Sequence, residues 1–331
     1  MTNIGTKYLG LDLKSPIIVG SSPLTDNVDS IVQLANAGAG AVVLKSLFEE
    51  QIHMDVDALR INNMHDSFSD AENYFSFFIR EKNLSDYLQL IKESKQKVDI
   101  PIIASINCKN YGEWVSFAQK IEDAGADALE INIFNIPADQ KYTGVDYERV
   151  YFDIVQELTK KVSIPIAIKI SPYFSGLANF ITRLSYSNID GIVLFNRFYE
   201  PDVDINSFEI KSKSFHSLDS DNSQVIRWMG ILSPLVKCDL CSSTGITSSE
   251  TLIKNLLVGA KAGMVVSQIL KDGPSLITKM NTFLEKWMVK HHFNTTKDFI
   301  GKLSQKNINK PIIFERTQFM RYFHDADFVN K

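Results

Sequence analysis

The chain has 331 residues, of which 44% are hydrophobic and 22% charged, and its formal net charge is −4. This composition is typical of a globular enzyme, and it gives no reason to expect a nucleic-acid partner, which favours a basic face. No apolar run reaches the roughly 18 residues of a membrane-spanning helix, and the first residues lack the charged and apolar regions of a signal peptide. We therefore expect no membrane partner and a cytoplasmic location.

Three cysteines, Cys108, Cys238 and Cys241, make a sparse set that suits a reducing compartment. The last two form a C-x-x-C in the run 235–241, which we expect to be a strand. Positions three apart on a strand face opposite sides, and no second Cys/His pair stands nearby to complete a tetrahedral metal site. We predict packed, inert thiols and no metal.

Eight short apolar runs alternate with helical patterns along the chain. The runs cover residues 17–19, 41–44, 102–106, 128–133, 166–170, 192–195, 235–241 and 264–266, and helical patterns cover 111–124 and 147–162. A capping box, Thr247-Ser248-Ser249-Glu250, is expected to open a helix that continues to Leu257. Strand–helix repetition of this kind predicts the α/β fold of a closed (β/α)8 TIM barrel. A doubly wound sheet is the alternative, but the chain has no G-x-G-x-x-G fingerprint.

Three segments exceed a minimal barrel: residues 49–83, 135–145 and 196–223. Each follows the C-terminal end of a predicted strand, which is the catalytic face of such a barrel, so we expect long functional loops there. The last barrel helix is expected over 276–290, and a helical or irregular C-terminal extension from about 293. Its Phe/Tyr-rich part, 314–328, would pack on the barrel or on a second subunit. No linker or charge block divides the chain, so we predict a single domain over 1–331.

Polar or small residues close most of the predicted strands. In chain order they are Ser21, Lys45 with Ser46, Asn107, Asn132, Lys169, Asn196, Ser243-Thr244-Gly245 and Ser267-Gln268. Because all eight strands of a barrel end at one mouth, these side chains are expected to converge there.

Lys169 stands inside the apolar run Ile-Ala-Ile-Lys-Ile, where an unmatched ammonium would be costly. One interpretation is that it pairs with a carboxylate such as Glu130. The other is that Lys45 and Lys169 face an electron-rich or anionic ligand such as a flavin, whose reduction a fixed cation favours. The small residues after the seventh and eighth strands predict a phosphate cradle, although turn chemistry would explain any one of them.

Taken in order, these motifs resemble the dihydroorotate dehydrogenase family, nearest its class 1 branch, over residues 6–290. The opening strand with Gly20-Ser21-Ser22-Pro23, the Val43-Leu44-Lys45-Ser46 motif and Lys169-Ile170-Ser171-Pro172-Tyr173 resemble the family's segments around the flavin ring. Ser243-Thr244-Gly245-Ile246 is similar to its Gly-Gly-Ile phosphate loop, and the segment from Gly259 to Ser267 is similar to the one that completes phosphate binding.

The resemblance implies an FMN cofactor bound by Ser21, Lys45, Ser46, Asn132, Lys169, Ser243, Thr244, Gly245, Ser267 and Gln268. It also implies catalytic roles at Lys169 and at the family's base position, and a small-molecule substrate that Asn132 and Asn196 would bind.

The substrate motifs depart from the family pattern. The strand-four motif Asn-x-Ser-Cys-Pro-Asn reads Asn132-Ile133-Phe134-Asn135-Ile136-Pro137, so the base position falls on Asn135. An amide cannot act as a general base near neutral pH. The family's substrate loop is not evident in residues 62–68. Candidate substitute bases near the mouth are His65, Cys108, Tyr142 and His216.

The sequence therefore predicts an FMN-dependent oxidoreductase that acts on the CH–CH donor dihydroorotate, in pyrimidine biosynthesis, or on a related cyclic amide. The alternatives are a flavin-binding paralogue without dihydroorotate activity and a flavin-free phosphosugar barrel enzyme with Lys169 as a Schiff-base lysine. A tRNA-dihydrouridine synthase would need a basic RNA-binding face, which this acidic chain does not indicate. We also expect a homodimer.

Overall fold

The computed structural model describes residues 2–48, 69–107, 111–134, 136–198, 200–212 and 216–315. Eight parallel strands of this part form a closed barrel in the order β4-β3-β13-β12-β9-β8-β7-β6, and β6 pairs with β4 to close the ring. They are β3 (Ile17–Val19), β4 (Ala41–Val43), β6 (Ile102–Asn107), β7 (Ala128–Asn132), β8 (Ile166–Ile170), β9 (Gly191–Leu194), β12 (Asp239–Ser242) and β13 (Ala262–Val265). The predicted (β/α)8 barrel is confirmed.

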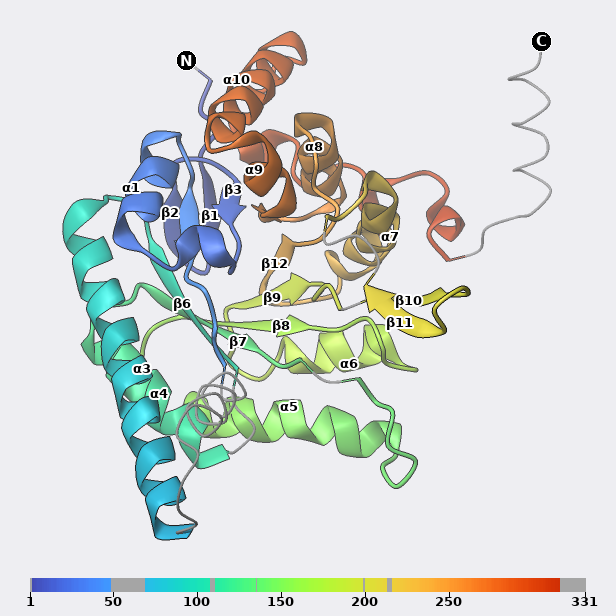
Figure 1. Ribbon diagram of the computed structural model, residues 1–331. Helices are drawn as coiled ribbons and strands as arrows, with labels where there is room; N and C mark the ends of the chain where they lie inside the picture. The colour runs from blue at the N-terminus through green and yellow to red at the C-terminus, as the bar shows by residue number, and fades with distance from the viewer. Residues whose placement is uncertain are drawn as a thin grey trace.

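Helices cover the outside of the barrel (Figure 1). They are α1 (Val28–Asn36), α3 (Ser69–Lys97), α4 (Tyr111–Asp123), α5 (Gly144–Leu158), α6 (Leu177–Leu184), α7 (Asn222–Leu232), α8 (Ser249–Val258), α9 (Ser267–Asp272) and α10 (Ser275–Lys290). Helix α6, for example, buries one apolar face made of Leu177, Phe180, Ile181 and Leu184. This is the amphipathic pattern that packs a helix on a sheet.

A hairpin of β1 (Thr6–Tyr8) and β2 (Leu11–Leu13) closes the N-terminal mouth of the barrel. Tyr8 and Leu9 are buried among the small residues Ala41, Ala128, Ala167 and Ala262. Gly191 belongs to the same space, because a Cβ there would lie 2.4 Å from Leu9 Cδ2. The N-terminal half of the barrel is therefore packed solid, which leaves the C-terminal half for a ligand.

Two predicted boundaries are wrong. The run 235–241 is a turn in its first half, because Leu235 N and Val236 N both donate to Leu232 O at the end of α7, and β12 begins only at Asp239. The N-cap of α8 lies one residue later than predicted, since Ser248 accepts from Thr251 N at 3.2 Å, and Glu250 is then not at the third position that a capping box requires. Thr247 instead donates to Asp219.

The cysteines near β12 are free thiols. Cys241 is buried in the barrel interior and Cys238 lies just before the strand. Burial raises the pKa of Cys238 to about 12, so it stays protonated and unreactive at neutral pH.

The long segments contain more regular structure than predicted. Helix α3 starts at Ser69, inside the first segment, and β5 (Leu47–Phe48) precedes it. The third segment holds a projecting hairpin of β10 (Pro201–Asp204) and β11 (Glu209–Ser212), then the turn η2 (Asp219–Asp221) (Figure 1).

The C-terminal extension runs through η3 (Thr296–Asp298), η4 (Gln305–Asn307) and η5 (Pro311–Ile313). Phe314 packs against the core beside Gly230, whereas the rest of the predicted Phe/Tyr-rich segment lies outside the described residues. Among the helices of the described chain, none combines the length and the apolar character needed to cross a membrane.

Candidate functional site

A cavity of about 510 Å³ opens at the C-terminal ends of the barrel strands. Its lining includes nearly all the side chains predicted from the strand ends: Ser21, Lys45, Ser46, Asn132, Lys169, Asn196, Ser243, Thr244, Gly245 and Ser267. Asn107 and Gln268 are not among the lining residues, and the Gln268 amide donates to Asp272 Oδ2 of α9 at 2.6 Å. The structure thus brings residues from seven of the eight strand ends into one space.

Hydrogen bonds between hydroxyl groups support the cavity wall where β3, β4 and β6 reach it. Ser21 Oγ lies 3.0 Å from Ser46 Oγ and accepts from Ser46 N at 2.8 Å. Ser46 Oγ lies 2.6 Å from the buried Ser105 Oγ. Tyr87 of α3 fixes Ser105 by accepting from its N–H at 2.7 Å and donating to its carbonyl at 3.0 Å. These bonds hold the Lys45–Ser46 turn against the barrel.

Lys169 pairs with Glu130, as the first interpretation predicted, and it also lies where the second would need it. Its Nζ lies 3.8 Å from Glu130 Oε1, and its side chain also lines the cavity. Glu130 is fully buried, and burial raises the pKa of its carboxyl, while Lys169 and the neighbouring Ser105 hydroxyl act in the opposite direction. The pair therefore places a cation at the cavity wall with its counter-charge behind it.

Two buried amides, at the ends of the strands on either side of β8, are without complete pairing. Asn132 and Asn196 are 6% and 7% exposed, and Asn132 Oδ1 and Asn196 Nδ2 have no hydrogen-bond partner among the described residues. Both side chains line the cavity. Because buried polar groups are normally paired, one free acceptor and one free donor make this wall suited to a polar ligand.

Small residues line the end of the cavity next to the C-terminal ends of β12 and β13. Thr244 and Gly245 both have φ of 74°, so the chain turns sharply as it leaves β12. Thr244 Oγ1 donates to Phe195 O at 3.1 Å, and Asn222 Nδ2 donates to Thr244 O at 2.9 Å. Ser217 Oγ and Ser267 Oγ lie 2.8 Å apart across this end. Backbone N–H groups and hydroxyls of this kind suit a phosphate.

Several lining residues were missed in the sequence: Phe134, Arg197, Phe198, Glu200 and Ser217. Phe134 stacks on Phe198 with ring centroids 4.1 Å apart, and Tyr173 meets Phe198 edge-on at 5.3 Å. Phe134 stands at the serine of the family motif, so an aromatic wall occupies a position where the family pattern has a hydroxyl. The signal for Arg197 was its place directly after Asn196.

In the part of the chain that the structure describes, none of the predicted catalytic bases lies in the cavity. Asn135, His65 and Cys108 lie outside that part. Tyr142 is exposed on the loop before α5, where its ring meets Tyr147 edge-on, and His216 is exposed; neither lines the cavity. No cluster of three or more His, Cys, Asp or Glu side chains fit to hold a metal occurs in the described ranges.

Comparison with known proteins identifies the family. The family model for dihydroorotate dehydrogenase matches residues 3–288. The catalytic subunit of dihydroorotate dehydrogenase B (NAD(+)) from Thermoplasma acidophilum is 24% identical, over 91% of this chain and 99% of that protein. Dihydroorotate dehydrogenase A (fumarate) from Lactobacillus delbrueckii is 24% identical, over 82% of this chain and 89% of its own length. Subunit PreA of NAD-dependent dihydropyrimidine dehydrogenase from Escherichia coli is 22% identical, over 92% of this chain and 78% of its own. The chain, with its closed barrel and polar mouth, belongs to the dihydroorotate dehydrogenase family.

Proposed function

We propose that the protein is an FMN-dependent oxidoreductase that acts on dihydroorotate or a related cyclic amide. The observation that supports it is the cavity itself: a cation, two incompletely paired amides and a small-residue end line one space of about 510 Å³. That volume falls within the range of cofactor sites in proteins.

The lining fits FMN at both ends. Thr244, Gly245 and Ser267 would hold the phosphate, while Lys169, Asn132 and Ser21 would lie beside the ring. Bound FMN would supply a hydride acceptor, the chemistry that a CH–CH donor needs. The protein's own part is to hold a positive charge at the ring through Lys169, to bind the substrate through Asn132 and Asn196, and to exclude water with the Phe134–Phe198 wall.

Proton removal is where this chain differs from its family. Asn135 takes the family's base position, and a general base contributes about 10²–10⁴-fold to such a step. We therefore expect weak dihydroorotate oxidation. Asn135→Cys restores a thiol at that position and should raise turnover if the surrounding geometry is intact. Wild-type turnover that is already fast, and falls on substitution of Cys108, Tyr142 or His216, would assign the base to that residue.

A partner protein is proposed for this chain by analogy with its relatives. The names of two relatives describe them as subunits, one of an NAD(+) enzyme and one of an NAD-dependent enzyme, so an electron-transfer partner for this chain belongs to the proposal. A homodimer, a cytoplasmic location and a role in pyrimidine biosynthesis stay predictions. Sedimentation of the purified protein tests the first of them.

The test is anaerobic mixing of the purified protein with dihydroorotate while the visible spectrum is recorded. We expect flavin absorbance before mixing and slow bleaching after it. A flavin spectrum that dihydroorotate leaves unchanged would favour the paralogue with another substrate. A colourless protein that takes up no added FMN would remove the proposal and favour flavin-free sugar-phosphate chemistry.

A further inference from the structure

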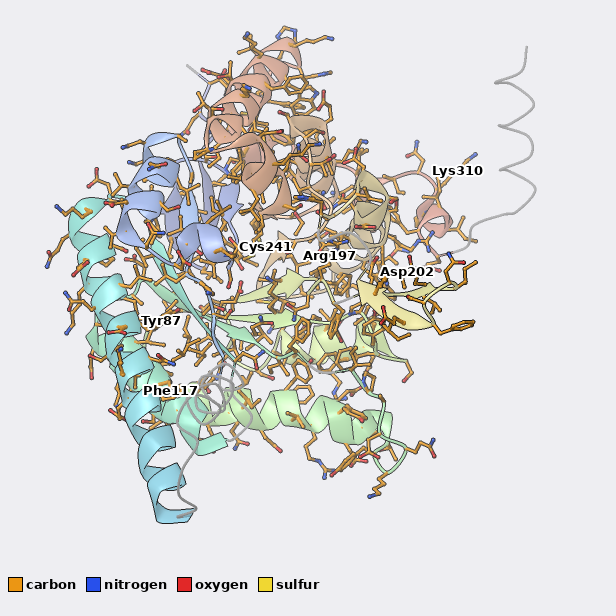
Figure 2. The ribbon with its side chains drawn as sticks, in the orientation of Figure 1. Tyr87, Phe117, Arg197, Asp202, Cys241 and Lys310 are labelled. Carbon is orange, nitrogen blue, oxygen red and sulfur yellow. The ribbon has the colours of Figure 1, made fainter. Side chains whose placement is uncertain are left out.

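We propose that Arg197 binds the phosphate group of the cofactor, an assignment that rests on the proposed function. Arg197 follows Asn196 at the C-terminal end of β9, and its side chain lines the cavity with 23% of its surface exposed. Figure 2 labels it between Cys241 of β12 and Asp202 of the β10–β11 hairpin. The strand-end pattern and the family motifs in the sequence stop at Asn196, the residue before it.

The strand order places Arg197 at the phosphate end of the cavity. The predicted phosphate residues follow β12 and β13, and β9 pairs directly with β12. Lys169 lies in β8 and Lys45 follows β4, neither of which pairs with β12 or β13. Of the cations that line the cavity in the described chain, Arg197 is therefore the one on a strand beside the cradle.

A side-chain contact points the same way. Arg197 Nη2 lies 3.9 Å from Asp221 Oδ2, in the turn that leads into α7. That turn packs on the cradle, because a Cβ on Gly245 would lie 2.5 Å from Asn222 N and 2.9 Å from Leu218 O. The guanidinium is thus held beside the turn that contacts Gly245.

A positive charge at Arg197 would offset the negative charges near the phosphate end of the cavity. Asp221 lies beside this end of the cavity and Glu200 is among the residues that line the cavity, so a phosphate dianion entering it would meet like charges unless a cation offset them. A guanidinium presents a planar fork of N–H donors that matches two phosphate oxygens, and it stays charged at any working pH. In the family resemblance Thr244 stands where the Gly-Gly-Ile backbone cradle has its first glycine. A side-chain cation complements a cradle altered in this way.

The test compares flavins with and without the phosphate. Apoprotein is titrated with FMN and with riboflavin, following the quenching of flavin fluorescence, for the wild type, Arg197→Gln and Arg197→Lys. We expect Arg197→Gln to weaken FMN about 10- to 100-fold, the size of one charge-assisted contact, and to leave riboflavin within about twofold. Arg197→Lys should lose less, because it keeps the charge without the fork. Arg183→Gln is the matched control: this exposed arginine pairs with Glu148 on the outer helices and should change neither affinity.

Equal weakening of both flavins, or unchanged FMN affinity, would overturn the assignment. Unchanged FMN affinity with a loss of orotate binding to the holoprotein would overturn it too, and would give the guanidinium to a substrate carboxylate. If the wild type bound neither flavin, the proposed function itself would fail.

A measurement on the wild type covers the case in which the variants do not fold. The apoprotein is treated with phenylglyoxal, and modified arginines are mapped by peptide mass spectrometry. FMN should protect Arg197 and riboflavin should not, while Arg183 should react equally in both samples. Equal reactivity of Arg197 with either flavin bound would contradict the proposal.

Discussion

The two ends of the cavity differ in how far the protein satisfies its own polar groups. At the phosphate end, the Ser217 and Ser267 hydroxyls bond to each other, and Thr244 bonds through both its hydroxyl and its carbonyl. At the ring end, Asn132 and Asn196 each keep a buried polar atom with no partner in the described chain. The hydroxyls at one end are paired without a ligand, and the two amides at the other are not fully paired.

This difference shows how the site is divided between stability and recognition. A buried polar atom without a partner costs about 1–3 kcal/mol, so the ring end weakens the fold until a ligand supplies the missing bonds. A ligand that supplies the matching donor and acceptor removes this cost and therefore binds more tightly, whereas a ligand without those groups does not. The paired hydroxyls of the phosphate end carry no such cost, and they are suited to a constant part of the ligand.

The largest expected effect is at the ring end, from Lys169→Met. The change leaves the buried Glu130 carboxyl without its counter-charge 3.8 Å away, and breaking a buried pair in this way costs about 3–5 kcal/mol. The double variant Lys169→Met/Glu130→Gln removes both charges and should recover most of the loss. Urea unfolding of the ligand-free proteins measures both. If single and double variants were equally unstable, the ion pair would not be what holds this wall.

At the phosphate end, Gly245→Ala tests backbone geometry. The residue has φ of 74°, and a Cβ would lie 2.5 Å from Asn222 N, so we expect a loss of about 1–3 kcal/mol and weaker FMN binding. Gly273→Ala is the matched control, since Gly273 has φ of 77° and nothing within 4 Å of the added carbon. It reports the conformational strain alone and should cost less. Equal losses would mean that the cradle is not closely packed.

The comparison itself is tested by a pair of variants with opposite signs. Asn132→Leu removes an unpaired buried acceptor and should raise the unfolding free energy of the ligand-free protein by about 1 kcal/mol while weakening substrate binding. Ser267→Ala removes a hydroxyl bonded at 2.8 Å and should lower it by about 1 kcal/mol. Thermal and urea unfolding without ligand give both values. Destabilisation by both variants would end the distinction between the two ends.

The smallest expected effect is a pH dependence. Because burial raises the pKa of Glu130 in the folded protein, the native state binds a proton more tightly than the unfolded chain. Its contribution to stability is then fully present below the unfolded pKa of about 4.3 and declines as pH rises towards the folded pKa. Glu130→Gln should remove this decline. An unchanged profile would show that the carboxyl ionises normally.

The barrel was predictable because its signal is repeated and local. Runs such as Ile166–Ile170 need only be apolar and β-branched, and eight of them in alternation with helices fix the architecture. The ring of strand-end residues followed from the same rule, since parallel strands bring their C-terminal ends together. Errors arose where local pattern and tertiary contact disagree: Thr247 reads as a cap, yet its hydroxyl bonds to Asp219 from another segment.

The rest of the site depends on contacts between side chains that are distant in the sequence, and such contacts produce no periodic pattern there. Arg197 reads as an ordinary loop residue until Asp221, 24 positions later, is seen beside it. Glu130 could be proposed as a partner of Lys169 only as one option, because the register Asn132↔Lys169 that brings the two strands together is a property of the closed barrel. Phe134 was visible in the motif, but its stacking on Phe198 was not.

The most direct test of the central claim is a crystal structure of the protein soaked with FMN. We predict the phosphate within hydrogen-bond distance of the Thr244–Gly245 backbone and Ser267, and the ring beside Lys169 with its polar edge on the Asn132 side. FMN bound in the opposite direction, or a cavity that stays without flavin at saturating FMN, would contradict the account.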